Sequence, residues 1–125
     1  MARKIFVLFI YLSVVVSVFS QNNYYIERAK GYMRDAEYYT KKAEWYEREA
    51  EFYNKKSQTY LRDAEYYSKS KKFDKANTYT KWANEAYENA RIRIKWANDS
   101  RENARVRMKW AQEAMEKARK QSVNA

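Results

Sequence analysis

The side chains of this chain that could do chemistry are carboxylates, cations and phenols, because it contains no histidine and no cysteine. Thiol nucleophiles, imidazole bases and the usual zinc ligands are therefore absent, and a single glycine cannot form a Gly-rich phosphate loop. Carboxylates pair at helical spacing, as in Glu47 and Glu51. Basic neighbours, such as Arg48 four residues after Glu44, make ion pairing on a helix surface the simpler account. We therefore expect no enzymatic activity, no cofactor and no metal.

Cations are concentrated in the second half of the chain. Residues 21–70 carry ten basic and nine acidic groups, whereas residues 71–125 carry fourteen and seven. Two basic segments that end at Trp96 and Trp110 predict contact with an anionic membrane or a glycosaminoglycan, or else a solvated helix face. The candidate anion contacts are Arg91, Arg93, Lys95, Arg105, Arg107 and Lys109. We do not expect nucleic acid as a partner, because no recognition module is visible.

The first residues predict secretion. Residues 1–20 combine a basic start with an apolar run, and small residues precede Gln21. This is the pattern of a signal peptide cleaved before Gln21, and the run is shorter than the roughly 20 apolar residues of the alternative, an uncleaved membrane anchor. Loss of the two cations of this segment lowers the net charge from +10 to +8. Asn98, which opens an Asn-Asp-Ser sequon, is then a candidate glycosylation site, although it falls within an expected helix.

Small and aromatic residues recur every seven positions along the rest of the chain. In the first half the tyrosines from Tyr32 to Tyr67 each follow a small residue by three positions, which predicts a coiled-coil seam with alanine at a and tyrosine at d. In the second half alanine holds the d position, and a 14-residue repeat is marked by three tryptophans. The predicted seam comprises Tyr25, Tyr32, Tyr39, Tyr46, Tyr53, Tyr60, Tyr67, Ala76, Ala83, Ala90, Ala97, Ala104, Ala111 and Ala118.

A change of phase divides the pattern into two helices. Ala64 and Ala76 are twelve residues apart instead of fourteen, and the polar segment 68–74 lies between them. This segment predicts a turn, with Ser70 or Asp74 as the cap of the second helix. The alternative is one continuous helix in a parallel oligomer, in which a local change of supercoil absorbs the slip.

The predicted fold is all-α, a single domain over residues 21–125 built as a long antiparallel helical hairpin. We expect a helix at about 23–69, a turn at about 69–73 and a helix at about 73–121. Residues that face each other would have numbers that sum to about 143, which pairs every seam tyrosine with an alanine. A large ring opposite a methyl group fills a layer without overpacking.

Further apolar side chains lie outside this seam and predict self-association into a helical bundle. Several lie one position from a seam residue, about 100° around the helix, where they either shield the edges of the seam or form a partner surface. The candidate interaction stripe comprises Trp45, Phe52, Trp82, Ile92, Trp96, Val106 and Trp110.

Two functional hypotheses follow. The first is a secreted, non-enzymatic coiled-coil protein with a structural or assembly role, of the silk, cement, matrix or secreted-coat type. Twelve of its 13 tyrosines lie after residue 20 and would supply phenols for oxidative cross-linking. The alternative is a cationic, membrane-active or polyanion-binding defence or effector protein, based on the positive charge and the Arg/Lys/Trp segments. The strict heptads and the lack of catalytic residues favour the first.

Overall fold

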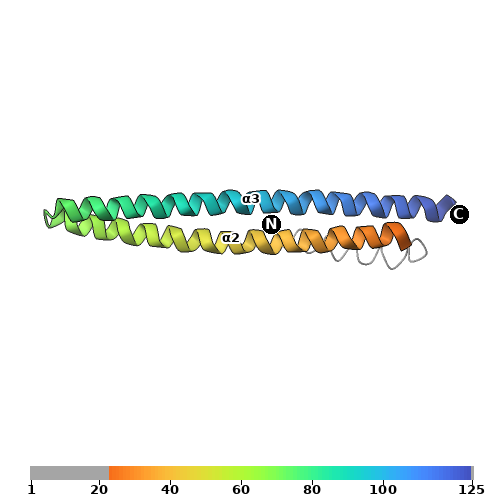
Figure 1. The fold of residues 1–125 in the computed structure, drawn as a ribbon, viewed down its shortest axis with the longest axis horizontal. Helices are drawn as coiled ribbons and strands as arrows, with labels where there is room; N and C mark the ends of the chain where they lie inside the picture. Colours follow the sequence, from red (N-terminus) through yellow and green to blue (C-terminus); the bar gives the residue numbers. More distant parts are fainter. Residues whose placement is uncertain (1–22, 125) are drawn as a thin grey trace. The chain divides into compact units, whose positions relative to one another are not determined.

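A computed structural model describes residues 23–124, which form two helices (Figure 1). Helix α2 spans Asn23–Lys69 and helix α3 spans Phe73–Asn124, so α3 continues beyond the predicted end at 121. The signal peptide predicted at residues 1–20 lies outside the described residues. Neither of the two described helices is long and apolar enough to cross a membrane.

Composition and surface ion pairs explain why both helices are long. The described residues contain no proline and a single glycine, so the backbone hydrogen bonding of the helices is not interrupted. Glutamates on the helix surface also pair with basic residues one turn later, and these pairs recur at every second heptad. The pairs are Glu37–Lys41, Glu51–Lys55 and Glu65–Lys69 in α2, and Glu88–Arg91, Glu102–Arg105 and Glu116–Arg119 in α3.

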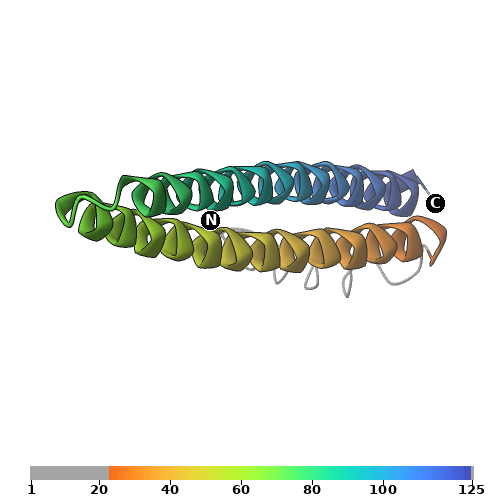
Figure 2. The ribbon, with the colours of Figure 1, turned by 60° about the vertical axis from the view of Figure 1, so that its left-hand side comes forward.

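The two helices pack against each other as an antiparallel hairpin (Figures 1 and 2). Contacts group the residues into two compact units: residues 23–41 with 100–124, here called the terminal unit, and Lys42–Asp99, the turn unit. In the turn unit Tyr46 contacts Trp96, a pair whose numbers sum to 142, close to the 143 expected for a hairpin. The hairpin, not the continuous helix, is thus the observed fold. The prediction of one domain concerns how the two units fold together, and it stays a prediction.

A left-handed residue ends α2. Lys71 has a φ of 60°, and its N–H donates to the carbonyl of Ser68 at 3.0 Å. The N–H of Lys72 donates to the carbonyl of Tyr67 at 2.8 Å. These two bonds form a Schellman motif, in which glycine usually holds the position of Lys71.

The N-cap residue of α3 is Lys72, and not either of the two residues predicted as its cap. Ser70 Oγ donates to the carbonyl of Tyr66, so the prediction that Ser70 caps α3 is wrong: its hydroxyl bonds to the last turn of α2. The carbonyl of Lys72 accepts a hydrogen bond from the N–H of Ala76, which is the first backbone bond of α3. Lys72 is therefore the N-cap residue of this helix. Asp74 lies in the first turn of α3, where a carboxylate interacts favourably with the helix dipole.

Small residues form the centre of both units. The seven seam alanines of α3 are buried, and the small residues of α2 are buried with them; the latter are Ala29, Ala36, Ala43, Ala50, Ser57 and Ala64. The seven seam tyrosines are only half-buried. Because small residues line both helices, the backbones approach closely and leave little room for a phenol ring between them. The rings lie at the side, where their hydroxyls can reach water.

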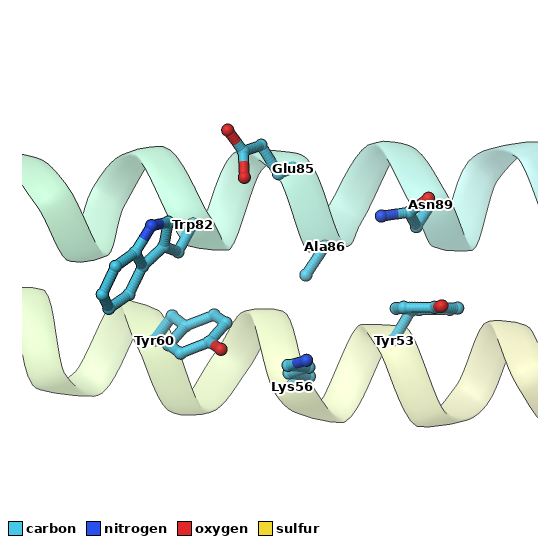
Figure 3. Close-up of a pocket in the computed structure, with 7 residues that line it drawn as sticks. All are labelled: Tyr53, Lys56, Tyr60, Trp82, Glu85, Ala86 and Asn89. Carbon is cyan, nitrogen blue, oxygen red and sulfur yellow. The ribbon is translucent and has the colours of Figure 1, made fainter.

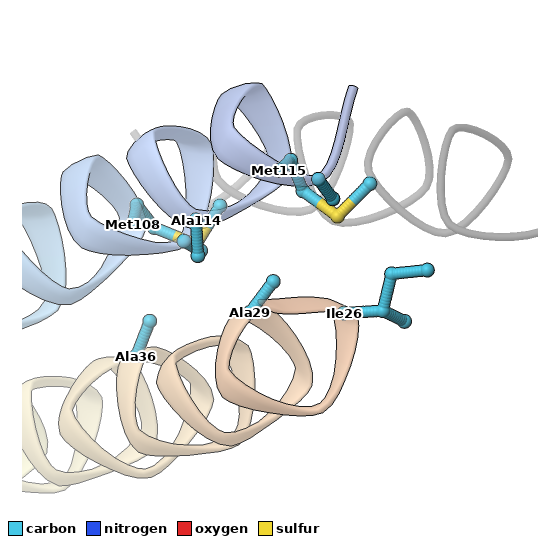
Figure 4. Packing of buried hydrophobic residues seen from close by; sticks show 8 residues of the cluster. Ile26, Ala29, Ala36, Met108, Ala114 and Met115 are labelled. Carbon is cyan, nitrogen blue, oxygen red and sulfur yellow. The ribbon is translucent and has the colours of Figure 1, made fainter. Parts of the chain in front are cut away.

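Larger apolar side chains supplement alanine only in the terminal unit. There Ile26 of α2 joins Met108 and Met115 of α3 in a buried cluster, shown in Figure 4. In the turn unit every buried hydrophobic residue is an alanine. A buried hydrogen bond also joins the helices of the turn unit, because Ser57 Oγ donates to the carbonyl of Ala83 at 2.8 Å.

Candidate functional site: an aromatic face with two equivalent notches

Aromatic rings and cations form a connected surface on each unit, here called the aromatic face. Neighbouring ring centroids are 5.0–6.1 Å apart, and the cations lie 4.9–6.0 Å from ring centroids, which are the distances of aromatic pairs and cation–π contacts. In the turn unit the face comprises Lys42, Trp45, Tyr46, Phe52, Tyr53, Lys56, Tyr60, Tyr66, Tyr67, Lys75, Tyr79, Trp82, Arg93 and Trp96. In the terminal unit it comprises Tyr24, Tyr25, Arg28, Tyr32, Tyr38, Tyr39, Arg107, Trp110 and Lys117.

Within each unit, the aromatic face brings together tyrosines of the predicted seam and aromatic members of the predicted interaction stripe, whereas Ile92 and Val106 of that stripe are not part of the face. Each α3 tryptophan packs on a seam tyrosine of α2 at 5.5–5.7 Å; the pairs are Trp82–Tyr60, Trp96–Tyr46 and Trp110–Tyr32. Trp45 and Phe52 pack on the tyrosines that follow them and are 52% and 60% exposed. Ile92 is exposed and Val106 is half-buried. The rings therefore shield the edges of the alanine interface and remain accessible.

Two of the predicted anion contacts are held inside the aromatic face. The guanidinium of Arg93 lies 5.0 Å from the ring centroids of both Tyr53 and Trp96. Its Nη1 donates to Asn89 Oδ1 at 3.2 Å, and its Nε lies 3.7 Å from Glu49 Oε2, an ion-pair distance too long for a hydrogen bond.

Arg107 repeats this arrangement in the terminal unit. Its guanidinium lies 5.1 Å from the ring centroid of Tyr39 and 4.9 Å from that of Trp110, and its Nη1 donates to Asn103 Oδ1 at 3.1 Å. Both guanidiniums are therefore packed against rings, and each donates through Nη1 to an asparagine one turn earlier, whereas the buried Nε of Arg93 has no hydrogen-bond partner.

The remaining basic side chains lie on the outer surface of α3. Arg91 and Arg105 pair with glutamates three residues earlier, whereas Lys95 and Lys109 are exposed. The hydrogen bond from Arg105 lowers the pKa of Glu102 and in turn raises that of the arginine. Asn98 is exposed near the middle of α3, and its glycosylation stays a prediction. The structure therefore does not gather these cations into one unpaired basic patch.

One heptad position of α3 alternates large and small side chains. The residues three positions after the seven seam alanines are Tyr79, Ala86, Arg93, Ser100, Arg107, Ala114 and Gln121. The large members fill space beside the α2 tyrosines, as Arg93 does beside Tyr53. The alanines leave that space open. The 14-residue repeat thus sets the spacing of open and filled positions along the aromatic face.

Each unit contains one notch at such an alanine. The turn notch has a volume of about 220 Å³ and is lined by Tyr53, Lys56, Tyr60, Trp82, Glu85, Ala86 and Asn89. Figure 3 shows Ala86 projecting from α3 toward the space between the two tyrosines of α2. The terminal notch has a volume of about 180 Å³ and is lined by Tyr25, Arg28, Tyr32, Trp110, Glu113, Ala114 and Lys117. Every lining residue of one notch lies four heptads from its counterpart in the other.

The shared chemistry of the two notches is two tyrosines, one tryptophan, one cation and one carboxylate. In the terminal notch Arg28 donates to Tyr32 Oη at 2.7 Å and to Tyr24 Oη at 3.3 Å, and these bonds raise the pKa of the arginine. In the turn notch Lys56 Nζ lies 5.9 Å from the Tyr60 ring centroid. Both cations are thereby placed beside the open space. Each notch thus offers aromatic walls together with a hydrogen-bond donor and an acceptor.

The fold and this surface define the class of protein as a two-helix antiparallel hairpin with an aromatic face. Within residues 23–124, acidic side chains nowhere form a group of three that could hold a metal ion. Comparisons with protein-family models, curated proteins and solved structures found no match. Function is therefore argued from the face and its notches alone.

Proposed function

We propose that this chain is a secreted, non-enzymatic coiled-coil protein with a structural or assembly role, and that it self-associates through its aromatic face into a helical bundle. The exposure of the large rings carries the proposal. Tyr24, Tyr38, Phe52 and Tyr66 are all at least 60% exposed and adjoin the half-exposed tryptophans. A contiguous apolar surface of this kind is typical of a protein–protein contact, and tyrosine, tryptophan and arginine are the residues that most often dominate such contacts.

The composition of the interface between the helices supports the same proposal. Alanine buries little apolar area, and the turn unit has no larger buried hydrophobic residue. Backbone ordering costs about 1–2 kcal/mol per residue, so a second source of apolar burial would stabilise the hairpin. The heptad spacing of the buried small residues is that of a coiled coil.

Sedimentation velocity on residues 21–125 tests this function. We expect a dimer or a larger species at micromolar concentration and a melting temperature that rises with concentration. A monomer whose melting temperature is independent of concentration would contradict the proposal.

Binding to vesicles separates the assembly role from the membrane-active alternative. The exposed Lys95 and Lys109 adjoin the half-exposed Trp96 and Trp110, so this part of α3 is the surface that a membrane would contact. On the assembly proposal, Trp96→Ala with Trp110→Ala lowers association and thermal stability, and no vesicles bind. Salt-sensitive binding of the wild-type chain to anionic but not neutral vesicles would favour the alternative.

A further inference from the structure

We propose that the two notches are docking sites for aromatic side chains of a second copy of this chain, and that Tyr38 and Tyr66 are the rings that enter them. The inference rests on the proposed self-association and names the contacts that carry it.

The size of the notches selects one ring as the occupant. Their volumes of about 220 and 180 Å³ lie below the range of about 300–1,000 Å³ that is usual for small-molecule sites. Two tyrosines and a tryptophan line each one, and these rings can pack on the faces and edges of a further ring. An aromatic side chain is therefore the largest group that each notch is built to hold.

The polar groups that the two notches share favour a ring with a polar tip. Glu85 and Glu113 each supply an acceptor for a phenol O–H, and Lys56 and Arg28 each supply a cation that can lie over a ring face. Lys56 and Glu85 balance each other in the turn notch, whereas Lys117 adds a second cation to the terminal notch. A phenol can use the donor and the acceptor that the two notches share. Tyrosine satisfies both requirements.

The period of the exposed rings matches the period of the notches. Tyr38 and Tyr66 each close one copy of the repeated Arg-Asp-Ala-Glu-Tyr segment, four heptads apart, and are 60% and 65% exposed. The notches are separated in sequence by the same four heptads. Tyr38 and Tyr66 belong to a series of α2 positions that are seven residues apart. In this series, Gly31 precedes Tyr32 of the terminal notch and Thr59 precedes Tyr60 of the turn notch, and neither residue carries a ring. The exposed rings and the notches are therefore repeated at the same interval of four heptads. Two copies of one chain that bind through the same surface require such a match.

A substitution that fills the notches without altering the fold tests this proposal. Ala86→Arg with Ala114→Arg places an arginine where Arg93 and Arg107 already pack between a tyrosine and a tryptophan. The matched control is Asn84→Arg with Gln112→Arg, which adds the same charge at exposed positions of the same helix. Circular dichroism checks that both variants stay helical and melt cooperatively.

Sedimentation equilibrium then measures the dissociation constant of each variant. We expect the filled variant to associate about tenfold or more weakly than the wild type, as for other central interface residues, and the control to associate as the wild type does. We expect Tyr38→Ser with Tyr66→Ser to weaken association similarly, whereas Tyr87→Ser, which removes an exposed ring outside the face, leaves it unchanged.

The outcomes distinguish this inference from the proposed function. If the wild type associates and the filled variant associates equally well, the notches are not the docking sites, although the assembly role stands. If the wild type itself stays monomeric, both proposals are overturned.

Discussion

The terminal and turn units share an alanine interface but differ at the heptad position four residues after each seam alanine. In the terminal unit this position holds Met108 and Met115, which are each 4% exposed. In the turn unit it holds Tyr87 and Ile94, which are 57% and 42% exposed. The buried pair belongs to a cluster that includes Ile26 of α2. Burial at one heptad position therefore depends on what the other helix supplies.

The facing helix explains the difference. The α2 series that contains Ile26 and Met33 continues at intervals of seven through Thr40 into Glu47, Asn54 and Leu61 in the turn unit, where Glu47 and Asn54 are polar. Glu47 and Asn54 offer less apolar surface to the other helix than Ile26 and Met33 do, which agrees with the exposure of Ile94 and Tyr87. Each buried methylene contributes about 0.8 kcal/mol, and the terminal unit therefore has the larger hydrophobic stabilisation.

The largest effect should come from removing the terminal cluster. We predict that Met108→Ala lowers the free energy of unfolding by about 2–4 kcal/mol, because it deletes a buried side chain and leaves a cavity. Ile94→Ala is the matched control at the same heptad position, and its effect should stay below about 1 kcal/mol because Ile94 is exposed. Urea unfolding measures both changes, and equal losses would remove the distinction between the units.

Transplanting the terminal pair should strengthen the turn unit. Asn54→Ile with Tyr87→Met copies Ile26 and Met115 to the positions four heptads away in each helix. We predict a gain of about 1–2 kcal/mol in the free energy of unfolding from the apolar area buried between the two new side chains. Urea unfolding of the double variant and of each single variant measures the coupling between them. A gain that is no greater than the sum of the single effects would show that the pair does not form.

A smaller gain should come from the turn itself. Lys71 holds a left-handed conformation with a φ of 60°, which is strained for a residue that has a Cβ. We predict that Lys71→Gly raises the free energy of unfolding by about 0.5–1 kcal/mol. Lys72→Gly, one residue later, is the control and should give no gain. The melting temperatures of the two variants provide the comparison.

The smallest effect is a loss of stability in alkali that involves Tyr79 of the turn unit. The nearby Tyr67 phenol, partial desolvation and Asp63 raise the pKa of Tyr79. A pKa raised by folding contributes stability that is present below the unfolded value of about 10 and is lost as the pH rises through the folded value. Tyr79→Phe should therefore reduce the loss of stability in alkali, as measured by thermal unfolding at several pH values. The equivalent position of the terminal unit, Arg107, carries no phenol and should show no such loss. An unchanged alkaline loss in the variant would assign it to other tyrosines.

Heptad spacing and its change of phase in the sequence were sufficient to predict two helices that pack as a hairpin and the turn between them. It could not decide the side to which the tyrosines turn, because an a/d assignment places alanine and tyrosine equally in the interior. That choice depends on small residues from both helices meeting at the centre. The notches were readable in principle, since the two Arg-Asp-Ala-Glu-Tyr segments are four heptads apart, which is twice the period of the 14-residue repeat. Recognising them required knowing that Ala86 and Ala114 face the tyrosines.

Native-state hydrogen exchange, followed by mass spectrometry, tests most directly the claim that the two units differ in stability. Peptides that cover residues 104–115 report on the cluster of the terminal unit, and peptides that cover residues 80–91 report on the alanine interface of the turn unit. At one protein concentration, the account predicts slower exchange in residues 104–115, because their opening exposes Met108 and Met115. Equal exchange, or slower exchange in residues 80–91, would contradict the account.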